Sequence, residues 1–120
     1  DTIQAAVLSV KLKYFDREIA LRQNVAQKYK KQFENADIKT PVVLPNRSHV
    51  YGQYTVAVKN RDIFINKLRK DNIPTAIYYP LPLNKQPAFS KYNQNNCPIS
   101  ERICQQVVSL PIRLYDEFQT

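Results

Sequence analysis

The chain has 120 residues, of which 43% are hydrophobic, so it can build one packed core and is not a disordered tail. Its single glycine excludes a glycine-rich phosphate loop, and one histidine with two cysteines is too few for a zinc site or a disulfide framework. Eighteen lysines and arginines against ten acidic residues give a net charge of +8. These cations are spread along the chain, which favours a solvated surface over a stripe that binds nucleic acid.

No apolar run approaches the roughly 20 residues that a membrane-spanning helix needs. No signal-peptide pattern opens the chain either. We therefore expect no membrane association. Cys97 and Cys104 do not form a disulfide framework, so a reducing compartment is the simplest setting, and we expect a cytoplasmic protein.

Residues 2 to about 35 are predicted to form one long helix. Their apolar residues recur at spacings of three, four and seven, and neither glycine nor proline interrupts them. At 1.5 Å per residue this helix would be roughly 50 Å long, which is more than the rest of a compact domain of this size can cover. Its first two turns are apolar nearly all round, so we expect them to pack against a preceding domain or a second subunit.

Two strands are predicted after this helix. Residues 42–44 are apolar and are flanked by Pro41 and Pro45, which is compatible with an edge strand. Residues 50–59 alternate between apolar and polar, which predicts a half-buried strand. The apolar face of this strand is expected to carry Val50, Tyr54, Val56 and Val58.

A second helix is predicted between Asn60, a favourable N-cap, and Asn72, which can adopt the left-handed conformation that ends a helix. Its buried stripe would be Phe64, Ile65 and Leu68. Residues 75–79 are expected to form a further strand, and residues 89–96 a loop.

A third helix is predicted to begin with Pro98 and to end at Leu110-Pro111, with a short strand near Ser109-Leu110. Taken together, these elements predict a single domain over residues 1–120 of the α+β class. It would contain a small mixed or antiparallel sheet, helices packed on one face of that sheet, and the long N-terminal helix.

Two adjacent tyrosines, Tyr78 and Tyr79, end the strand predicted over residues 75–79, just before two prolines. Neighbouring strand residues point to opposite faces, so one ring can pack inward while the other is offered beyond the strand's end. Asn84, Lys85 and Gln86 follow and can hydrogen-bond a polar ligand. A core tyrosine beside a surface tyrosine is the simpler structural interpretation, and both interpretations stay open here.

The residues alone do not compose a complete active site. With one histidine, the spacing supports no Ser-His-Asp or Cys-His arrangement. The acidic neighbours Asp16/Glu18 and Asp116/Glu117 lack the apolar surroundings that would separate their pKa values. Every lysine lies in a polar stretch, unlike the desolvated lysine that forms a Schiff base. We therefore predict no catalytic, cofactor-binding or metal-binding residue within the chain.

Several short motifs nevertheless follow one another in a specific order along nearly the whole chain. They are the opening 1–12 segment, Arg22 and Tyr29, Val50–Tyr54, Arg61-Asp62, Ile73–Thr75, Tyr79–Pro82, Gln86-Pro87, Pro98–Arg102 and Ser109–Pro111. As a set they resemble the C-terminal segment of the DegT/StrS group of pyridoxal-phosphate-dependent nucleotide-sugar aminotransferases.

This resemblance implies that the chain is roughly the last third of an enzyme with the aspartate-aminotransferase fold. The large domain, with pyridoxal phosphate and the Schiff-base lysine, would lie upstream, so the chain alone would be inactive. In such enzymes an amino group passes from glutamate to the keto carbon of a nucleotide-linked sugar, for polysaccharide or glycoconjugate sugar biosynthesis. The resemblance also implies a homodimer.

In the family, the region matching residues 75–86 lines the sugar-nucleotide entrance, typically as His-Tyr-Pro-x-Pro-x-His. Here Tyr78 and Asn84 replace the two histidines, whereas Tyr79 and Gln86 agree with the pattern. The resemblance therefore implies that Tyr78, Tyr79, Asn84 and Gln86 position the substrate, with no imidazole for acid–base chemistry at the first of them.

Two other interpretations remain. The protein could be a catalytically silent relative that binds a partner or regulates, because a degenerate large domain is not visible in this sequence. It could also be a basic module that binds nucleic acid, in which case binding to DNA would weaken steeply with salt. The absorption band of lysine-bound pyridoxal phosphate in the full-length protein would separate the enzyme from the silent relative.

Overall fold

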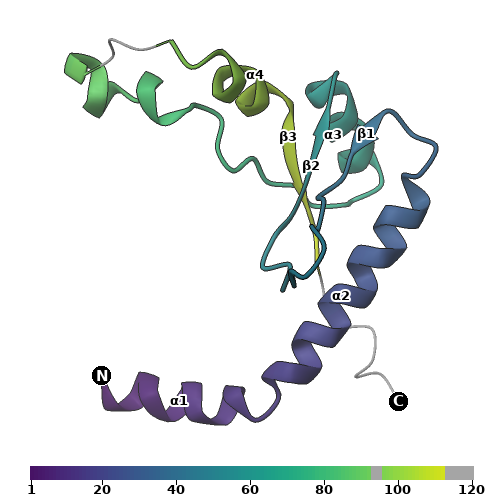
Figure 1. The fold of residues 1–120 in the computed structure, drawn as a ribbon, viewed down its shortest axis with the longest axis vertical. Helices are drawn as coiled ribbons and strands as arrows, with labels where there is room; N and C mark the ends of the chain where they lie inside the picture. The colour runs from purple at the N-terminus through teal and green to yellow at the C-terminus, as the bar shows by residue number, and fades with distance from the viewer. Residues whose placement is uncertain (93–95, 113–120) are drawn as a thin grey trace.

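The computed structural model describes residues 1–92 and 96–112, and it has a small sheet at its centre (Figure 1). The sheet has three strands in the order β1-β2-β3, and both pairings are antiparallel. The predicted α+β class is thereby confirmed. In chain order the elements are α1 (Thr2–Leu12), α2 (Phe15–Gln32), β1 (Ile38–Lys39), β2 (Tyr54–Val58), α3 (Arg61–Lys70), the 3-10 helices η1 (Leu83–Lys85) and η2 (Pro87–Tyr92), α4 (Pro98–Gln106) and β3 (Val107–Leu110).

One face of the sheet carries the core. Because side chains alternate along a strand, Tyr54, Val56 and Val58 of β2 lie on the same face, and all three are buried. Val108 and Leu110 of β3 extend this buried face. The helices that cover it contribute Ala26, Tyr29 and Phe33 from α2 and Phe64, Ile65 and Leu68 from α3.

The opposite face of the sheet is more open. The pairing of β1 with β2 puts Lys39 beside Ala57, and the pairing of β2 with β3 puts Thr55 beside Ser109. The hydroxyl oxygens of Thr55 and Ser109 lie 2.8 Å apart, so each polar group has a partner across the strands. This face is the first place to look for contacts beyond the core.

The predicted single long helix is wrong, because α1 and α2 are separate helices with a turn at residues 13 and 14. The amides of Lys13 and Tyr14 bond to carbonyls only three residues back, at 3.2 and 3.0 Å, which tightens the last turn of α1. The carbonyl of Tyr14 then accepts the first hydrogen bond of α2, from Glu18 at 3.0 Å. Figure 1 shows α1 leaving α2 at a wide angle and lying away from the sheet.

The helix α3 has the boundaries that the sequence predicts. Asn60 precedes it, although its side chain makes no capping hydrogen bond. Asn72 takes a left-handed φ of 56° just after its end. The amides of Asn72 and Ile73 bond to the carbonyls of Arg69 and Leu68 at 3.0 and 2.9 Å, the paired bonds of a Schellman motif.

The helix α4 begins at Pro98 as predicted but ends four residues before Leu110. Residues 107–110 are the strand β3 instead, so the short strand expected near Leu110 is confirmed and the longer helix is wrong. Arg61, at the start of α3, donates to the Cys104 carbonyl at 2.6 Å. A cation at a helix's carboxyl end is favourable, so this bond holds the two helices together.

Three predicted segments differ from the structure. Residues 42–44 are not a strand, because their side chains find no sheet edge and Val42 is 81% exposed. Residues 75–79 form only one bridge, between Ala76 and Ser109, since the neighbouring prolines leave few donors for a ladder. Val50 is 47% exposed because β2 starts only at Tyr54, after Tyr51 turns the chain with a φ of 46°.

The predicted loop over residues 89–96 begins inside η2, so its first part is helical rather than irregular. Residues 93–95 of that loop and the acidic pair Asp116/Glu117 lie outside the described residues. The radius of gyration is 17.7 Å, compared with about 14 Å for a compact domain of this length. The excess reflects α1 and the segment that carries η1 and η2, which both project from the sheet (Figure 1).

Candidate functional site

Tyr78 lines a hollow of about 370 Å³ beside the bridge between Ala76 and Ser109. We call this space the bridge hollow. Gln53, which directly precedes β2, lines it together with Thr75 and Ser109, so an amide and three hydroxyl-bearing side chains surround the same space. These groups both donate and accept hydrogen bonds, as binding of a sugar hydroxyl requires.

The two tyrosine rings are both exposed, Tyr78 at 45% and Tyr79 at 69%. The expectation that one of them packs inward is therefore wrong for the described residues. Their centroids lie 6.0 Å apart with an angle of 64° between the planes, an edge-on contact. Tyr79 does not line the bridge hollow, so the two rings face different surroundings.

Asn84 lies in η1 and contacts α4 rather than the bridge hollow. Its side-chain nitrogen donates to the Oε1 atom of Glu101 at 3.2 Å. The Nζ atom of Lys85 lies 3.5 Å from the same oxygen. The hydrogen bond from Asn84, with the nearby charge of Lys85, holds the pKa of Glu101 below its ordinary value.

Gln86 makes a local contact. Its side-chain nitrogen donates to the Leu81 carbonyl at 3.4 Å, within the same segment. The structure thus does not bring the four predicted site residues together. Tyr78 lines the bridge hollow, and Tyr79 lies beside it but outside that hollow. Asn84 lies in η1 and contacts α4, and Gln86 directly follows η1.

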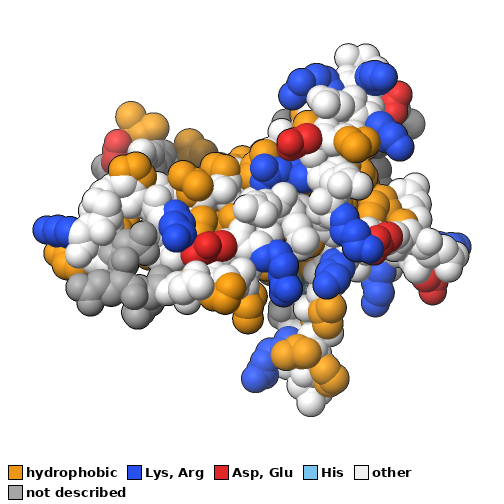
Figure 2. Space-filling view, turned by 90° about the horizontal axis from the view of Figure 1, so that it is seen from above, with side chains coloured by type: hydrophobic (Ala, Val, Ile, Leu, Met, Phe, Trp, Pro, Cys, Tyr) orange, Lys and Arg blue, Asp and Glu red, His pale blue; other side chains and the backbone are white. Residues whose placement is uncertain are grey.

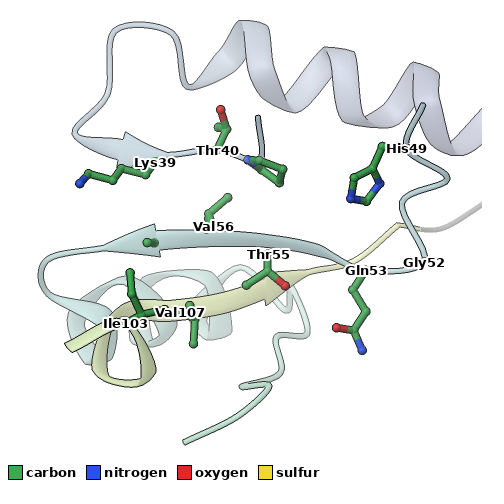
Figure 3. A pocket seen from close by; sticks show the side chains of 11 residues that line it. Lys39, Thr40, His49, Gly52, Gln53, Thr55, Val56, Ile103 and Val107 are labelled. Atoms are coloured by element: carbon green, nitrogen blue, oxygen red, sulfur yellow. The ribbon is translucent and has the colours of Figure 1, made fainter. Parts of the chain in front are cut away.

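A second and larger hollow, of about 830 Å³, lies on the open face of the sheet (Figure 3). We call it the sheet hollow. Lys39, Thr55 and Val107 line it from the three strands, and Gln53 lines both hollows. The sequence held a signal for this surface, because Gln53 and Thr55 fall on the polar side of the alternation in residues 50–59.

His49, the only histidine, lies at one end of the sheet hollow (Figure 3). Its Nδ1 atom accepts a hydrogen bond from the amide of Tyr51 at 2.8 Å, which assigns the proton of the neutral ring to Nε2. Its ring also stacks on that of Tyr51, with centroids 4.2 Å apart. These contacts give His49 a role in shaping the turn before β2.

All the lysines lie within the described residues, and none has the enclosed, desolvated position that a Schiff-base lysine needs, because each of them is exposed. Nor do three or more His, Cys, Asp or Glu side chains gather as a metal site would require, anywhere in residues 1–92 and 96–112. Among the helices in these same ranges, none has the length and apolarity needed to cross a membrane.

Figure 2 shows the lysines and arginines dispersed over one face of the molecule, with apolar and uncharged groups between them. The net charge of +8 therefore does not appear on this face as one continuous basic stripe. The bridge hollow offers uncharged hydrogen-bonding groups. The sheet hollow is more mixed, because the apolar Val56, Ile103 and Val107 line it together with polar side chains. The bridge hollow is therefore the better suited of the two to a polar, hydroxyl-rich ligand.

Comparison with known proteins gives relatives along almost the whole chain. It is 44% identical over 115 residues to the UDP-2-acetamido-2-deoxy-3-oxo-D-glucuronate aminotransferase of Pseudomonas aeruginosa, a match that covers 96% of this chain and 32% of that protein. It is 43% identical over 112 residues to the dTDP-3-amino-3,6-dideoxy-alpha-D-galactopyranose transaminase of Aneurinibacillus thermoaerophilus, covering 93% and 31% respectively.

The fold also matches a solved structure. A DegT DnrJ EryC1 StrS aminotransferase from Brucella abortus superimposes with a TM-score of 0.88 at 33% identity, over 96% of this chain and 31% of that one. The chain thus spans about a third of the length of the relatives it matches. The model of the DegT/DnrJ/EryC1/StrS aminotransferase family matches residues 1–118, and the chain therefore belongs to that family.

Proposed function

We propose that this chain is the substrate-covering, C-terminal domain of a pyridoxal-phosphate-dependent aminotransferase that acts on a nucleotide-linked keto sugar. The observation that carries the proposal is the family match over residues 1–118. The amino donor is glutamate, and the product serves polysaccharide or glycoconjugate sugar biosynthesis. We further propose that the full-length protein is cytoplasmic and works as a homodimer.

The exposed apolar side chains of α1 support the role of this chain as one part of a larger protein. Ile3, Leu8 and Leu12 are all exposed, and α1 has no buried residue. Apolar side chains gain about 25 cal/mol for each Å² that is removed from water, so this helix is stabilised when another surface covers it. In our proposal that surface is the cofactor-binding part of the same protein.

Pyridoxal phosphate enters the proposal as a group held outside this chain. The exposed lysines described above do not suit it, and we assign no cofactor contact to any residue here. What this chain supplies is the binding of the sugar nucleotide. Tyr78 and Tyr79 would contact its rings or hydroxyls, and Asn84 and Gln86 belong to the segment that covers it.

The names of the two relatives guide the choice of substrate. Both specify a nucleotide-linked sugar, one with an oxo group and one with an amino group at carbon 3. A UDP-linked or dTDP-linked 3-keto sugar is therefore the first substrate to test. In the full-length protein we expect glutamate-dependent amination of such a sugar, together with the absorption band of lysine-bound pyridoxal phosphate.

Tyr79→Ala in the full-length protein tests the proposed contact. We expect turnover of the keto sugar to fall about tenfold, while the half-reaction with glutamate stays within about twofold of normal, because the side chain contacts only the sugar substrate. Tyr92→Ala is the matched control, since Tyr92 is an equally exposed tyrosine on the same projecting segment. Equal loss of both half-reactions in Tyr79→Ala would show that the residue is structural.

A second candidate is a catalytically silent relative that binds a partner. The observation in its favour is that Tyr78 and Asn84 stand where the family typically has histidine. A full-length protein that shows no absorption band with pyridoxal phosphate, and that lacks a lysine at the Schiff-base position, would support this candidate over the enzyme.

A further inference from the structure

Glu101 links two parts of the molecule that are far apart in the sequence. It lies in the first turn of α4, and its Oε1 atom accepts from Asn84 at 3.2 Å and lies 3.5 Å from Nζ of Lys85. Both partners belong to η1, which follows the exposed tyrosines Tyr78 and Tyr79. We call residues 78–86 the substrate-covering segment of the proposed function. One carboxylate oxygen of Glu101 thus contacts two consecutive residues of this segment.

The chemistry of this contact favours a carboxylate at position 101. An ionised glutamate only accepts hydrogen bonds, so the amide nitrogen of Asn84, and not its oxygen, must face it. The side chain of Glu101 is only 29% exposed, so its ion pair with Lys85 is screened less than a fully exposed pair would be. Hydrogen bonds to an ionised partner are about twice as strong as neutral ones.

The position of α4 is itself fixed. Its last residue, Gln106, leads directly into β3, and Arg61 donates to the Cys104 carbonyl near its carboxyl end at 2.6 Å. The segment that carries the tyrosines leaves the sheet at the bridge between Ala76 and Ser109. The Glu101 contact therefore gives this segment a second attachment to the sheet, by way of α4.

We propose that Glu101 is a positioning residue for the substrate-covering segment. Through Asn84 and Lys85 it holds residues 81–86 against α4, and so it sets where Tyr78, Tyr79 and Gln86 stand. The structural part of this proposal depends only on the contacts above. Its consequence for sugar binding rests on the proposed function.

Hydrogen exchange of the full-length protein tests the structural part. In Glu101→Ala we expect the amides of residues 81–92 to exchange about fivefold faster or more, because local opening is easier once one attachment is lost. Glu101→Gln keeps an acceptor for Asn84 but loses the ion pair, so its effect should be smaller. Gln105→Ala, an exposed position on the same helix, is the control and should leave this exchange unchanged.

Equal exchange of residues 81–92 in Glu101→Ala and in the unsubstituted protein would overturn the proposal, whatever the activity of the protein. If Glu101→Ala does not fold, Asn84→Ala removes the same hydrogen bond from the other side. Faster exchange in Asn84→Ala then supports the contact, and unchanged exchange overturns it.

Steady-state kinetics tests the consequence for sugar binding. In Glu101→Ala we expect the KM for the nucleotide keto sugar to rise about tenfold, with the glutamate half-reaction and the melting temperature little changed. The KM of the double variant Asn84→Ala/Glu101→Ala should be no higher than that of the more impaired single variant, because each single substitution already removes the same hydrogen bond. Fully additive losses, or an unchanged KM, would overturn the role in positioning.

The two failures are distinguishable. If the unsubstituted protein aminates no nucleotide sugar, the proposed function fails, while the exchange experiment still decides whether Glu101 holds the segment. If the unsubstituted protein is active and Glu101→Ala matches it in both exchange and KM, the proposed function stands and the positioning role fails.

Discussion

The body of the molecule and its projections carry similar apolar side chains with opposite exposure. In the body, formed by α2, α3, α4 and the sheet, Tyr54 is 1% exposed. In the projections, which are α1 and residues 78–92, Leu8 is 64% exposed. The comparison teaches that apolar pattern alone does not tell which surface covers a side chain. The apolar side chains of the body are buried by this chain itself. We infer that those of the projections are buried by other parts of the full-length protein or by its substrate.

The largest expected effect is a loss of stability when a buried ring of the body is removed. Tyr54→Ala removes a buried ring that contacts Tyr29 and Tyr51, so we expect the free energy of unfolding to fall by about 3–5 kcal/mol. Urea denaturation of the full-length protein measures this loss. Tyr92→Ala, at an exposed tyrosine of a projection, should cost no more than about 0.5 kcal/mol. Similar losses in the two variants would remove the distinction between body and projections.

The next effect tests whether α1 is covered in the full-length protein. We expect Leu8→Ala to cost about 2 kcal/mol or more there, as a buried leucine does. If α1 is as exposed in the full-length protein as it is in this chain, the loss should instead be about 0.5 kcal/mol or less. Val42→Ala gives the comparison value for an apolar side chain outside α1.

A smaller loss of stability is expected when a single hydrogen bond of the body is removed. The hydroxyl of Tyr29 donates to the Pro111 carbonyl at 2.9 Å, and burial raises the pKa of Tyr29, so the donor proton is retained. Tyr29→Phe removes this bond and keeps the ring, for which we expect a loss of about 1 kcal/mol. A loss within error of zero in a denaturation experiment would show that water replaces the bond at no cost.

The smallest expected effect is the pH dependence of the stability that Glu101 contributes, where residues 78–92 contact α4. Because the pKa of Glu101 is lowered, first by the hydrogen bond from Asn84, its folded state favours the carboxylate. The stability that it contributes is therefore present above the ordinary glutamate value of 4.5 and is lost as the pH falls below it. The stability difference between the unsubstituted protein and Glu101→Gln should therefore shrink as the pH falls over that range. A difference that grows on acidification would contradict this sign.

Local signals in the sequence predicted the body well. Asn60 and Asn72 bracket α3, and Pro98 begins α4, because each of these residues limits a helix through its own conformation. Alternation placed Tyr54 and Val56 on the buried face for the same local reason.

Features that depend on distant partners were not predictable in this way. The turn at Tyr14 contains neither glycine nor proline, so nothing in the sequence separates α1 from α2. The strand predicted over residues 75–79 needed a long edge of β3 to pair with, and in the structure it makes only the bridge between Ala76 and Ser109. Likewise, the contact between Asn84 and Glu101 joins residues 17 positions apart, and no local pattern predicts it.

The hydrogen bond from Arg61 to the Cys104 carbonyl has a consequence for how the two ends of α4 respond to acid. The acceptor of this bond is a backbone carbonyl and not a carboxylate, so the bond does not need an ionised acceptor. At the amino end of α4, by contrast, acid protonates the Glu101 carboxylate and so weakens its contacts with Asn84 and Lys85. Acidification should therefore release residues 81–86 from the amino end of α4, while the carboxyl end of this helix stays bonded to Arg61 at the start of α3.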